Sequence, residues 1–400
     1  MQHNTSRPSY LRALHRAVGE LVDRQLLSDE LEFSALTQSA ARATGLTDFG
    51  PDDWQEPLRY LLQDFAGCAE LNSTGRVIAR KLVLGLLRNR LRLVARYSSI
   101  NPTDIERPVF IVGLPRTGST LLHELCGSTS AFRTPTFWQS ETLPDGNWTD
   151  AAKIATSGAR IAFLNALAPD FRHIHRLGAL LPHECVTIQA LSFRSMQFFA
   201  IHNVASYHAW LAQCDWGPAY EWHQRYLQVM QGNGGNVRWL LKAPGHMLGI
   251  TALLERYPDA RFVQLHRHPC EVIPSMASLY ANLRQSCNDR VDLAAIGEAV
   301  VEQWRCGIDR LDAARRENDV DWRFIDVDYR RLVDDPLGCC LDVFDFLGAD
   351  VTAHDHAAMC RYLEHHPRNK SARHEYTLAQ FGLEPSQIES GFAGYIARFC

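Results

Sequence analysis

Residues 109–127 constrain the fold more than any other stretch of the chain. An apolar run, Val109–Leu114, predicts a buried strand, and a loop bounded by Gly113 and Gly118 joins it to a helical pattern. Gly118 lets the backbone turn where a side chain would collide. The N–H groups that follow point into a concavity at the helix N-terminus, which favours an anion. The segment therefore predicts an anion site built into an α/β sheet.

The loop has the sequence Gly113-Leu114-Pro115-Arg116-Thr117-Gly118-Ser119-Thr120. Its G-x-x-x-x-G spacing matches a nucleotide phosphate loop, but Ser119 stands where triphosphate-binding loops carry a lysine. The cation comes earlier, at Arg116, and the hydroxyls of Ser119 and Thr120 can add donors. Such a loop suits a compact anion held without a bridging metal. A tight strand-to-helix turn that binds nothing is the alternative.

The composition indicates a globular protein and excludes several classes. Of 400 residues, 46% are hydrophobic and 22% are charged, which excludes disorder or coiled coil as a description of the whole chain. The net charge of −4 argues against a nucleic-acid partner held by bulk positive charge. No apolar run is long enough for stable membrane insertion, and the polar N-terminus MQHNTSRPSY predicts a cytoplasmic location. The 11 cysteines, without any C-x-x-C pair, are expected to be reduced core residues and not metal ligands.

Four short apolar runs predict buried strands, with helical patterns between them. The runs are Val109–Leu114, Arg238–Lys242, Arg261–His266 and Arg323–Val327. Strands that alternate with helices predict a mostly parallel sheet. We expect an α/β fold with a P-loop-like parallel sheet flanked by helices, a helical N-terminal extension and a helical, aromatic-rich insertion.

The predicted boundaries separate a helical extension, residues 1–106, from a catalytic α/β domain, residues 107–400. Residues 128–236 form the insertion, on the acceptor side of the site. It holds five of the nine tryptophans: Trp138, Trp148, Trp210, Trp216 and Trp222. An aromatic acceptor pocket and an ordinary packed subdomain are both compatible with this composition. One helix of the extension carries Arg80, Arg88, Arg90 and Arg92, which we interpret as a solvated face; contact with an anionic surface is the alternative.

A second anion site is predicted at the end of the third strand. Arg267 follows the strand at the edge where open α/β sheets bind ligands, and Pro269 fits the first turn of the next helix. Ser275 stands eight positions after Arg267, and Pro274 should bend the helix so that the serine hydroxyl approaches the guanidinium. An arginine fork with a hydroxyl is a good phosphate clamp. The alternative is a salt bridge between Arg267 and Glu271.

Together these segments resemble the PAPS-dependent sulfotransferases, above all the larger bacterial, mycobacterial-type members (PAPS is 3′-phosphoadenosine 5′-phosphosulfate). The run Pro115–Thr120 is similar to their 5′-phosphosulfate loop, so Arg116, Thr117, Gly118, Ser119 and Thr120 would contact the donor. Arg267 and Ser275 resemble their 3′-phosphate pair. The segment 328–336 resembles their tyrosine-containing segment, in which Tyr329 would contact adenine. A reduced basic loop near Arg373 would complete the cofactor site. The resemblance covers residues 107–400.

The resemblance implies in-line attack by an acceptor hydroxyl on the sulfur of PAPS, with no metal. Arg116 and Lys242 are the candidates that stabilise the charge on the departing phosphate. Lys242 ends a predicted strand, is one of only four lysines, and matches the catalytic lysine of the family. A structural lysine with no role in transfer is the alternative.

Four residues compete to be the base that accepts the proton of the acceptor hydroxyl. Glu141 lies just beyond the first helix, where glutamate-using relatives place their base, and ranks first. His246 and His175 follow, and Glu184 is fourth because a structural role fits it too.

The sequence thus predicts a bacterial enzyme that moves a sulfuryl group from PAPS, leaving PAP (adenosine 3′,5′-bisphosphate), to a small, hydrophobic and lipid-like hydroxyl acceptor. The sequence is also compatible with a homodimer. Two alternatives remain: a P-loop small-molecule kinase with Asp326 or Asp328 as its magnesium acid, and a non-catalytic adenosine-bisphosphate-binding protein.

Overall fold

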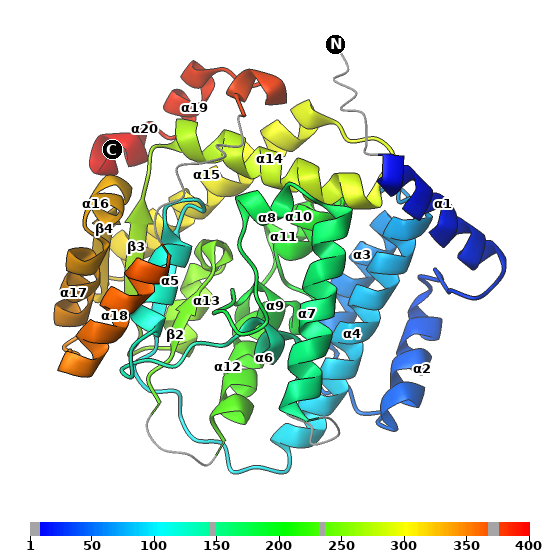
Figure 1. Cartoon of the computed structure of the whole chain (residues 1–400), viewed down its shortest axis with the longest axis horizontal. Helices are drawn as coiled ribbons and strands as arrows, with labels where there is room; N and C mark the ends of the chain where they lie inside the picture. The colour runs from blue at the N-terminus through cyan, green and yellow to red at the C-terminus, as the bar shows by residue number, and fades with distance from the viewer. Residues whose placement is uncertain (1–8, 144–148, 233–236, 367–375) are drawn as a thin grey trace.

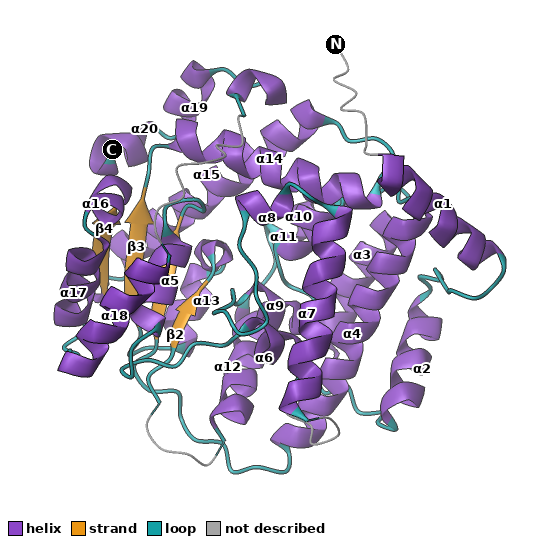
Figure 2. Ribbon diagram, in the orientation of Figure 1, coloured by secondary structure: helices purple, strands orange, loops and turns teal. Residues whose placement is uncertain are grey.

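The computed structural model describes residues 9–143, 149–232, 237–366 and 376–400. Its sheet has four parallel strands in the order β2-β1-β3-β4. The strands are β1 (Val109–Gly113), β2 (Leu240–Lys242), β3 (Arg261–His266) and β4 (Phe324–Asp328). They match the four predicted runs within two residues at each end, and the predicted α/β fold with a parallel sheet is confirmed (Figure 2).

Helices make up most of the rest of the chain (Figure 1). The N-terminal helices are α1 (Ser9–Asp23), α2 (Phe33–Thr44), α3 (Gln55–Ala66) and α4 (Ser73–Tyr97). Helix α5 (Ser119–Gly127) follows β1. Between α5 and β2 lie α6 (Phe137–Glu141), α7 (Asp150–Leu167), α8 (Phe171–Ile174), α9 (Val186–Gln189), α10 (Gln197–Ile201), α11 (Ala205–Leu211) and α12 (Gly217–Gln231). After β2 come α13 (Ile250–Arg256), α14 (Pro269–Cys287), α15 (Leu293–Glu317), α16 (Tyr329–Asp334), α17 (Pro336–Phe346), α18 (Ala353–His365), α19 (Pro385–Gly391) and α20 (Ala393–Phe399).

The side chains of the strands alternate between two hydrophobic clusters, because successive residues of a strand point to opposite faces. Val109 and Ile111 of β1 pack with α5, α17 and α18, while Phe110 and Val112 face the larger cluster on the other side. Both faces of the sheet are therefore covered, as parallel sheets require.

The order of the strands creates a switch point between β1 and β3. From β1 the chain crosses to β2 on one side, and it returns to β3 on the other side of β1. At such a point the loops after the two strands diverge and leave a crevice at their carboxyl ends. The loop after β1 and Arg267 after β3 both lie at this crevice.

The helical N-terminal extension packs into the larger cluster. Leu58 of α3 and Leu87 of α4 share it with Tyr226 of α12 and Phe110 of β1, and all four are fully buried. Residues 1–106 therefore help to build the core beside the insertion. The division at residue 106 stays a prediction.

One expectation for α4 was wrong. Arg90 is completely buried, although we interpreted it as part of a solvated face. Its guanidinium donates to the carbonyls of Phe49 and Leu191, forms a 2.5 Å ion pair with Asp53 and lies 3.8 Å above the ring of Trp222. A buried charge that is fully paired in this way fixes the N-terminal helices against the insertion.

The core also holds histidines that must stay neutral. His202 and His223 have no measurable exposure, and burial lowers the pKa of each to about 3. Burial likewise lowers the pKa of His123 to about 3 and that of His246 well below its ordinary value. An unfolded chain binds protons at these rings below about pH 6.5, whereas the folded protein does not.

Stability should therefore fall as the pH drops below about 6.5. Each of the four rings contributes a slope of about 1.4 kcal/mol per pH unit between its unfolded and folded pKa values, and the loss is absent above pH 7. We expect the urea midpoint to be flat at neutral pH and to decrease steeply from pH 6.5 to pH 5. His202→Leu should flatten this slope by about a seventh, because burial also lowers the pKa of His175 and His208 to about 4 and that of His183 to about 3. The exposed His354→Gln should not change it. A urea midpoint that does not change between pH 6.5 and pH 5 would contradict the conclusion that these buried histidines stay neutral in the folded protein.

Candidate functional site

The loop after β1 has the backbone conformation expected of an anion site. Arg116 and Gly118 have φ values of +63° and +81°, in the left-handed region. A Cβ on Gly118 would lie 2.8 Å from a methyl group of Leu332 and 3.5 Å from the ring of Tyr329, so only glycine fits there. The N–H groups of Ser119 and Thr120 open α5 without intrahelical partners. Ser119 and Thr120 line the main cavity, whereas the Thr117 hydroxyl donates to the carbonyl of Leu114 and closes the loop.

Arg116 is held from two directions. Its Nε donates to the hydroxyl of Ser275 at 3.2 Å, and its Nη1 donates to the carbonyl of Ile174. Burial lowers the pKa of Arg116, and the nearby Arg267 adds to that effect. The guanidinium is thus fixed at the loop, and its hydrogen bond to Ile174 connects the phosphate loop to the residue before His175.

Arg267 joins the other two predicted segments to the loop. Its Nη1 donates to the carbonyl of Arg116 at 2.8 Å, and its guanidinium lies 4.1 Å from the centre of the Tyr329 ring. It also pairs with Glu271 at 2.8 Å, which is the alternative we considered. Ser275 is buried on α14, which runs through Pro274 without a break, and its hydroxyl contacts Arg116 and not Arg267.

Lys242 lies beneath the loop as half of a buried ion pair. Its ammonium is 2.6 Å from Glu184 and 3.4 Å from the hydroxyl of Thr120. The N–H of Cys185 donates to the carbonyl of Lys242 at 2.9 Å, which places the neighbouring Glu184 beside the end of β2. Burial raises the pKa of Glu184, but Lys242, His175 and other neighbours overcome that effect and lower it to about 2. Sequence reasoning ranked Glu184 fourth, and the contact with Lys242 was not visible in the spacing of the residues.

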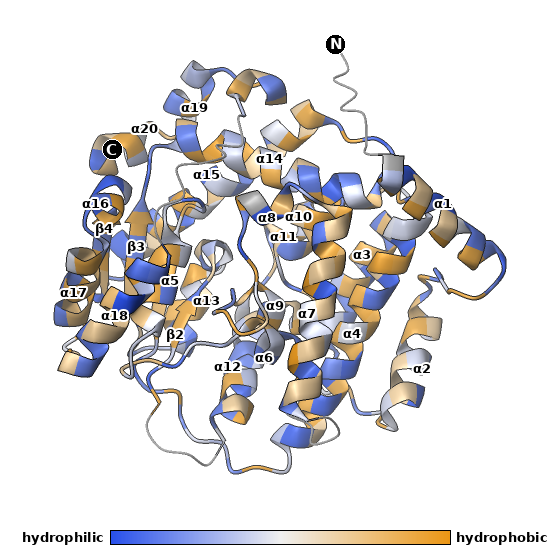
Figure 3. Cartoon of the chain, viewed as in Figure 1, coloured by the Kyte–Doolittle hydropathy of each residue, from blue (hydrophilic) through white to orange (hydrophobic). Residues whose placement is uncertain are grey.

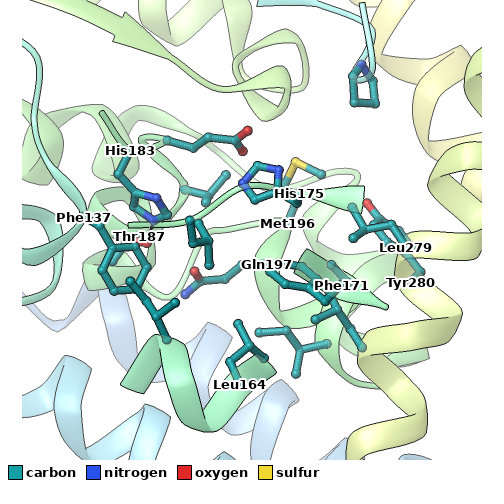
Figure 4. A pocket seen from close by; sticks show the side chains of 18 of the residues that line it. Phe137, Leu164, Phe171, His175, His183, Thr187, Met196, Gln197, Leu279 and Tyr280 are labelled. Carbon is teal, nitrogen blue, oxygen red and sulfur yellow. Dashed lines mark hydrogen bonds between the residues drawn. The ribbon is translucent and has the colours of Figure 1, made fainter. Parts of the chain in front are cut away.

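A cavity of about 810 Å³ extends from the phosphate loop into the helical region. In Figure 4 the rings of His175 and His183 lie on one side of it, with Leu164 of α7 opposite. Apolar side chains of α4, α7, α10 and α14 form most of the wall, among them Leu82, Phe163, Ala200, Leu279 and Leu283. Arg116, Arg267 and Tyr329 lie at the polar end.

The candidate bases are placed differently in relation to this cavity. Glu141, His175 and Glu184 line it, but His246 does not. His246 is buried behind the sheet, where its Nδ1 lies 3.0 Å from the Tyr220 hydroxyl and its ring packs on Phe110.

The electrostatic surroundings separate Glu141 from His175. Burial lowers the pKa of His175 to about 4, and Lys242 and Arg116 add to that effect while Glu184 opposes it. Burial raises the pKa of Glu141, and Arg160, 3.2 Å away, opposes the rise. The charges around the phosphate loop therefore affect the pKa of His175, whereas the pKa of Glu141 is affected by Arg160 on α7.

The wall of the cavity bears on the two interpretations that the sequence left open for the tryptophans of the insertion. The described tryptophans Trp138, Trp210, Trp216 and Trp222 are not among its lining residues, and three of them are buried in the core. Phenylalanines of the insertion line it instead: Phe137, Phe163 and Phe171. Lys81 of α4 also lines it, a contact missed from the sequence although lysines are scarce in this chain. Trp148 and Arg373 lie outside the described residues.

The two acids considered for a kinase have structural roles. Asp326 pairs with Arg315 at 2.7 Å and with His266 at 2.8 Å, and these contacts hold its pKa well below the ordinary value despite burial. Asp328 caps α16 by accepting from the N–H of Arg331. In the described part of the chain, no group of three or more His, Cys, Asp or Glu side chains is arranged as a metal site.

These features define an α/β protein with a phosphate-type loop at the switch point of its sheet and an apolar cavity beside it. The model of the sulfotransferase family matches residues 108–353, so the chain belongs to the sulfotransferase family and is an enzyme of that class. The sequence-based recognition of this family is confirmed.

Solved structures and a curated relative agree. Sulfotransferase STF1 from Mycobacterium tuberculosis H37Rv is 32% identical, with a TM-score of 0.78 over 91% of this chain and 98% of that one. STF9 from Mycobacterium avium is 26% identical, with a TM-score of 0.79 over 92% and 97%. The omega-hydroxy-beta-dihydromenaquinone-9 sulfotransferase Stf3 of Mycobacterium bovis is 25% identical over 296 residues, which are 68% of this chain and 71% of that protein.

The ion pair between Lys242 and Glu184 should be sensitive to the loss of one partner. Lys242→Met leaves a carboxylate in the cavity wall without its cation, and we expect it to lower the free energy of unfolding by about 3–5 kcal/mol. The double variant Lys242→Met/Glu184→Gln should recover most of that loss in urea denaturation at pH 7. The exposed pair of Arg331 and Asp342 supplies the control, because Arg331→Met should change stability little. Equal losses in the single and double variants would show that the two side chains are not coupled.

Proposed function

We propose that the protein transfers the sulfuryl group of PAPS to a hydroxyl group of a small hydrophobic acceptor and releases PAP. The observation that carries this proposal is the phosphate loop at the polar end of an apolar cavity of about 810 Å³. An anionic donor bound at the loop and an apolar acceptor bound in the cavity would meet where the loop and the cavity join.

The residues around the loop fit such a donor. The N–H groups and hydroxyls of Ser119 and Thr120 and the guanidinium of Arg116 would bind the 5′-phosphosulfate. Arg267 would bind the 3′-phosphate, which would compete with Glu271 for the guanidinium. Ser275 is the proposed second partner there, and it already contacts Arg116.

Tyr329 is the proposed adenine contact. Its ring already lies against Gly118 and beneath Arg267, at the edge of the cavity. An aromatic face at this position can stack on a base.

The acceptor is proposed from the wall of the cavity. Aliphatic and aromatic side chains from four helices surround it, so an apolar body would be desolvated favourably while its hydroxyl reaches the loop. The name of the relative Stf3 describes a hydroxylated menaquinone derivative as acceptor, which supports a lipid-like molecule. A cytoplasmic location and a homodimer stay predictions.

The transfer step breaks the bond between sulfur and the 5′-phosphate oxygen and forms a bond between sulfur and the acceptor oxygen. Arg116 and Lys242 would stabilise the charge on the leaving phosphate. Glu184 would position the ammonium of Lys242, which it contacts at 2.6 Å. The acceptor proton passes to a base.

We assign the base to His175, with Glu141 as the second candidate. A pKa of about 4 keeps the His175 ring neutral at pH 7, so that it has a lone pair for the proton. The adjacent carboxylate of Glu184 would stabilise the imidazolium that forms. Arg116 donates a hydrogen bond to the carbonyl of Ile174, the residue before His175. This contact supports a position of His175 close to the donor.

Donor binding is tested by calorimetry. The protein should bind PAP, and EDTA should leave the affinity unchanged. Arg267→Ala should weaken binding by about 2–4 kcal/mol, because it removes a charge-assisted contact to a buried phosphate. Arg305→Ala, an exposed arginine on α15, is the control and should bind normally. Binding of magnesium-ATP with no heat from PAP would favour the kinase alternative and refute the proposal.

The base is tested by turnover. His175→Asn should slow sulfuryl transfer to a hydroxyl acceptor by about 10²- to 10⁴-fold while the affinity for PAP stays the same. Glu141→Gln, assayed beside it, should keep most of the activity. Mass spectrometry of the acceptor for the gain of one SO₃ gives the readout. The opposite ranking of the two variants would move the base to Glu141, as the sequence comparison first suggested.

A further inference from the structure

Helix α7 has an unusual outer surface for an exposed helix. Beyond Asp150 its sequence, AAKIATSGARIAFLNAL, contains no acidic residue and only two cations. Lys153 is buried, with 2% exposure, and its ammonium donates to the carbonyl of Leu143. Arg160 is therefore the only charged side chain that the described helix exposes after its first residue.

We define the α7 surface as the exposed apolar residues of this helix with the aromatic residue beside them: Ala155, Ala159, Ala162, Phe163, Ala166 and Tyr10. Phe163 is 47% exposed and Tyr10 is 48% exposed. The hydroxyl of Tyr10 donates to the carbonyl of Ala166, so α1 continues the surface. Figure 3 shows α7 largely in tan and orange on the face toward the viewer. Exposed apolar patches of this kind mark interaction sites.

The α7 surface borders the cavity through Ala159 and Phe163. Ala159, Arg160 and Phe163 line the cavity and are exposed at the same time, as is Lys81 of α4. An apolar surface, two aromatic side chains and cations therefore meet at the place where an acceptor would enter.

We propose that the α7 surface docks on an anionic lipid bilayer. Aromatic and aliphatic side chains of an interfacial helix enter the region between headgroups and acyl chains, while lysine and arginine reach the phosphates. Lys81 and Arg160 are placed for this role, with Arg160 sharing its charge with Glu141. Its purpose, delivery of a lipid-like acceptor into the cavity, rests on the proposed function.

A bilayer fits this surface better than a second copy of the chain. A two-fold contact centred on α7 would bring Lys81 and Arg160 toward their own copies, and it would close the entrance of the cavity. None of the described helices is long and apolar enough to cross a membrane, so the contact would be peripheral.

The test is co-sedimentation with vesicles, which needs neither donor nor turnover. The protein should bind phosphatidylcholine vesicles that contain phosphatidylglycerol, and salt should weaken the binding. Ala155→Glu/Ala162→Glu should lower the partition coefficient about tenfold or more, because anionic headgroups repel both carboxylates. Neither alanine lines the cavity, and glutamate is a good helix former.

The matched control carries the same two substitutions on α20, at the other side of the molecule in Figure 1: Ala393→Glu/Ala397→Glu. It should bind vesicles like the unmodified protein, and both variants should keep the affinity for PAP and the melting temperature. Absence of vesicle binding, or equal losses in the two variants, would overturn the docking proposal. Light scattering supplies a second test. A dimer of the unmodified protein that Ala155→Glu/Ala162→Glu dissociates, but the α20 variant does not, would also overturn the docking proposal. Since PAP binding is measured separately, failure of the docking surface is distinguishable from failure of the proposed function.

Discussion

The hydrogen bond from Arg267 to the carbonyl of Arg116 is the contact on which the site depends. It joins the loop after β1 to the end of β3, the two strands that flank the switch point. Because Arg116 has a left-handed backbone, its carbonyl turns toward Arg267, while its own guanidinium reaches Ser275 and Ile174. One strained residue thus connects both predicted anion-binding segments with the wall of the cavity, so that the proposed donor would meet both with little rearrangement.

The charges around the loop are arranged to stay fixed in a dry environment. Lys242 would lose its hydration shell beneath the loop, and Glu184 replaces water as its partner at 2.6 Å. The same carboxylate opposes the lowering of the pKa of His175, which burial causes. A single acidic side chain therefore affects both the cation that would stabilise the leaving group and the ring that would accept the proton. This dual role explains why Glu184 could not be recognised as structural or chemical from its sequence pattern alone.

The sheet was predictable because its signals are local. Buried parallel strands appear as continuous apolar runs, and the glycines of the loop are required by its backbone; Gly118 leaves no space for a Cβ beside Leu332. The three segments with a family resemblance do lie together, since Arg267 contacts both Arg116 and Tyr329. The cavity was not predictable, since its wall combines α4, α7, α10 and α14 from distant parts of the chain. Arg90 illustrates the same limit: helical spacing places it with Arg80, Arg88 and Arg92, which are only partly buried, but packing against Trp222 and Asp53 decides its own burial. The roles of the individual site residues stay predictions.

One of the N-terminal helices, α4, forms part of the wall of the cavity. Helix α4 packs against the core with Leu87 and Leu91 and presents Ile78, Lys81 and Leu82 to the cavity. Arg90 fixes the same helix to the segment before α3 through Asp53, and to the insertion through the carbonyl of Leu191. The wall that α4 forms is therefore part of the packed core, and the adjoining wall comes from α7, whose Ile161, Phe163 and Leu164 line the cavity. In the proposed function, the apolar body of the acceptor would extend along these two helices, and the packed wall of α4 would limit its length.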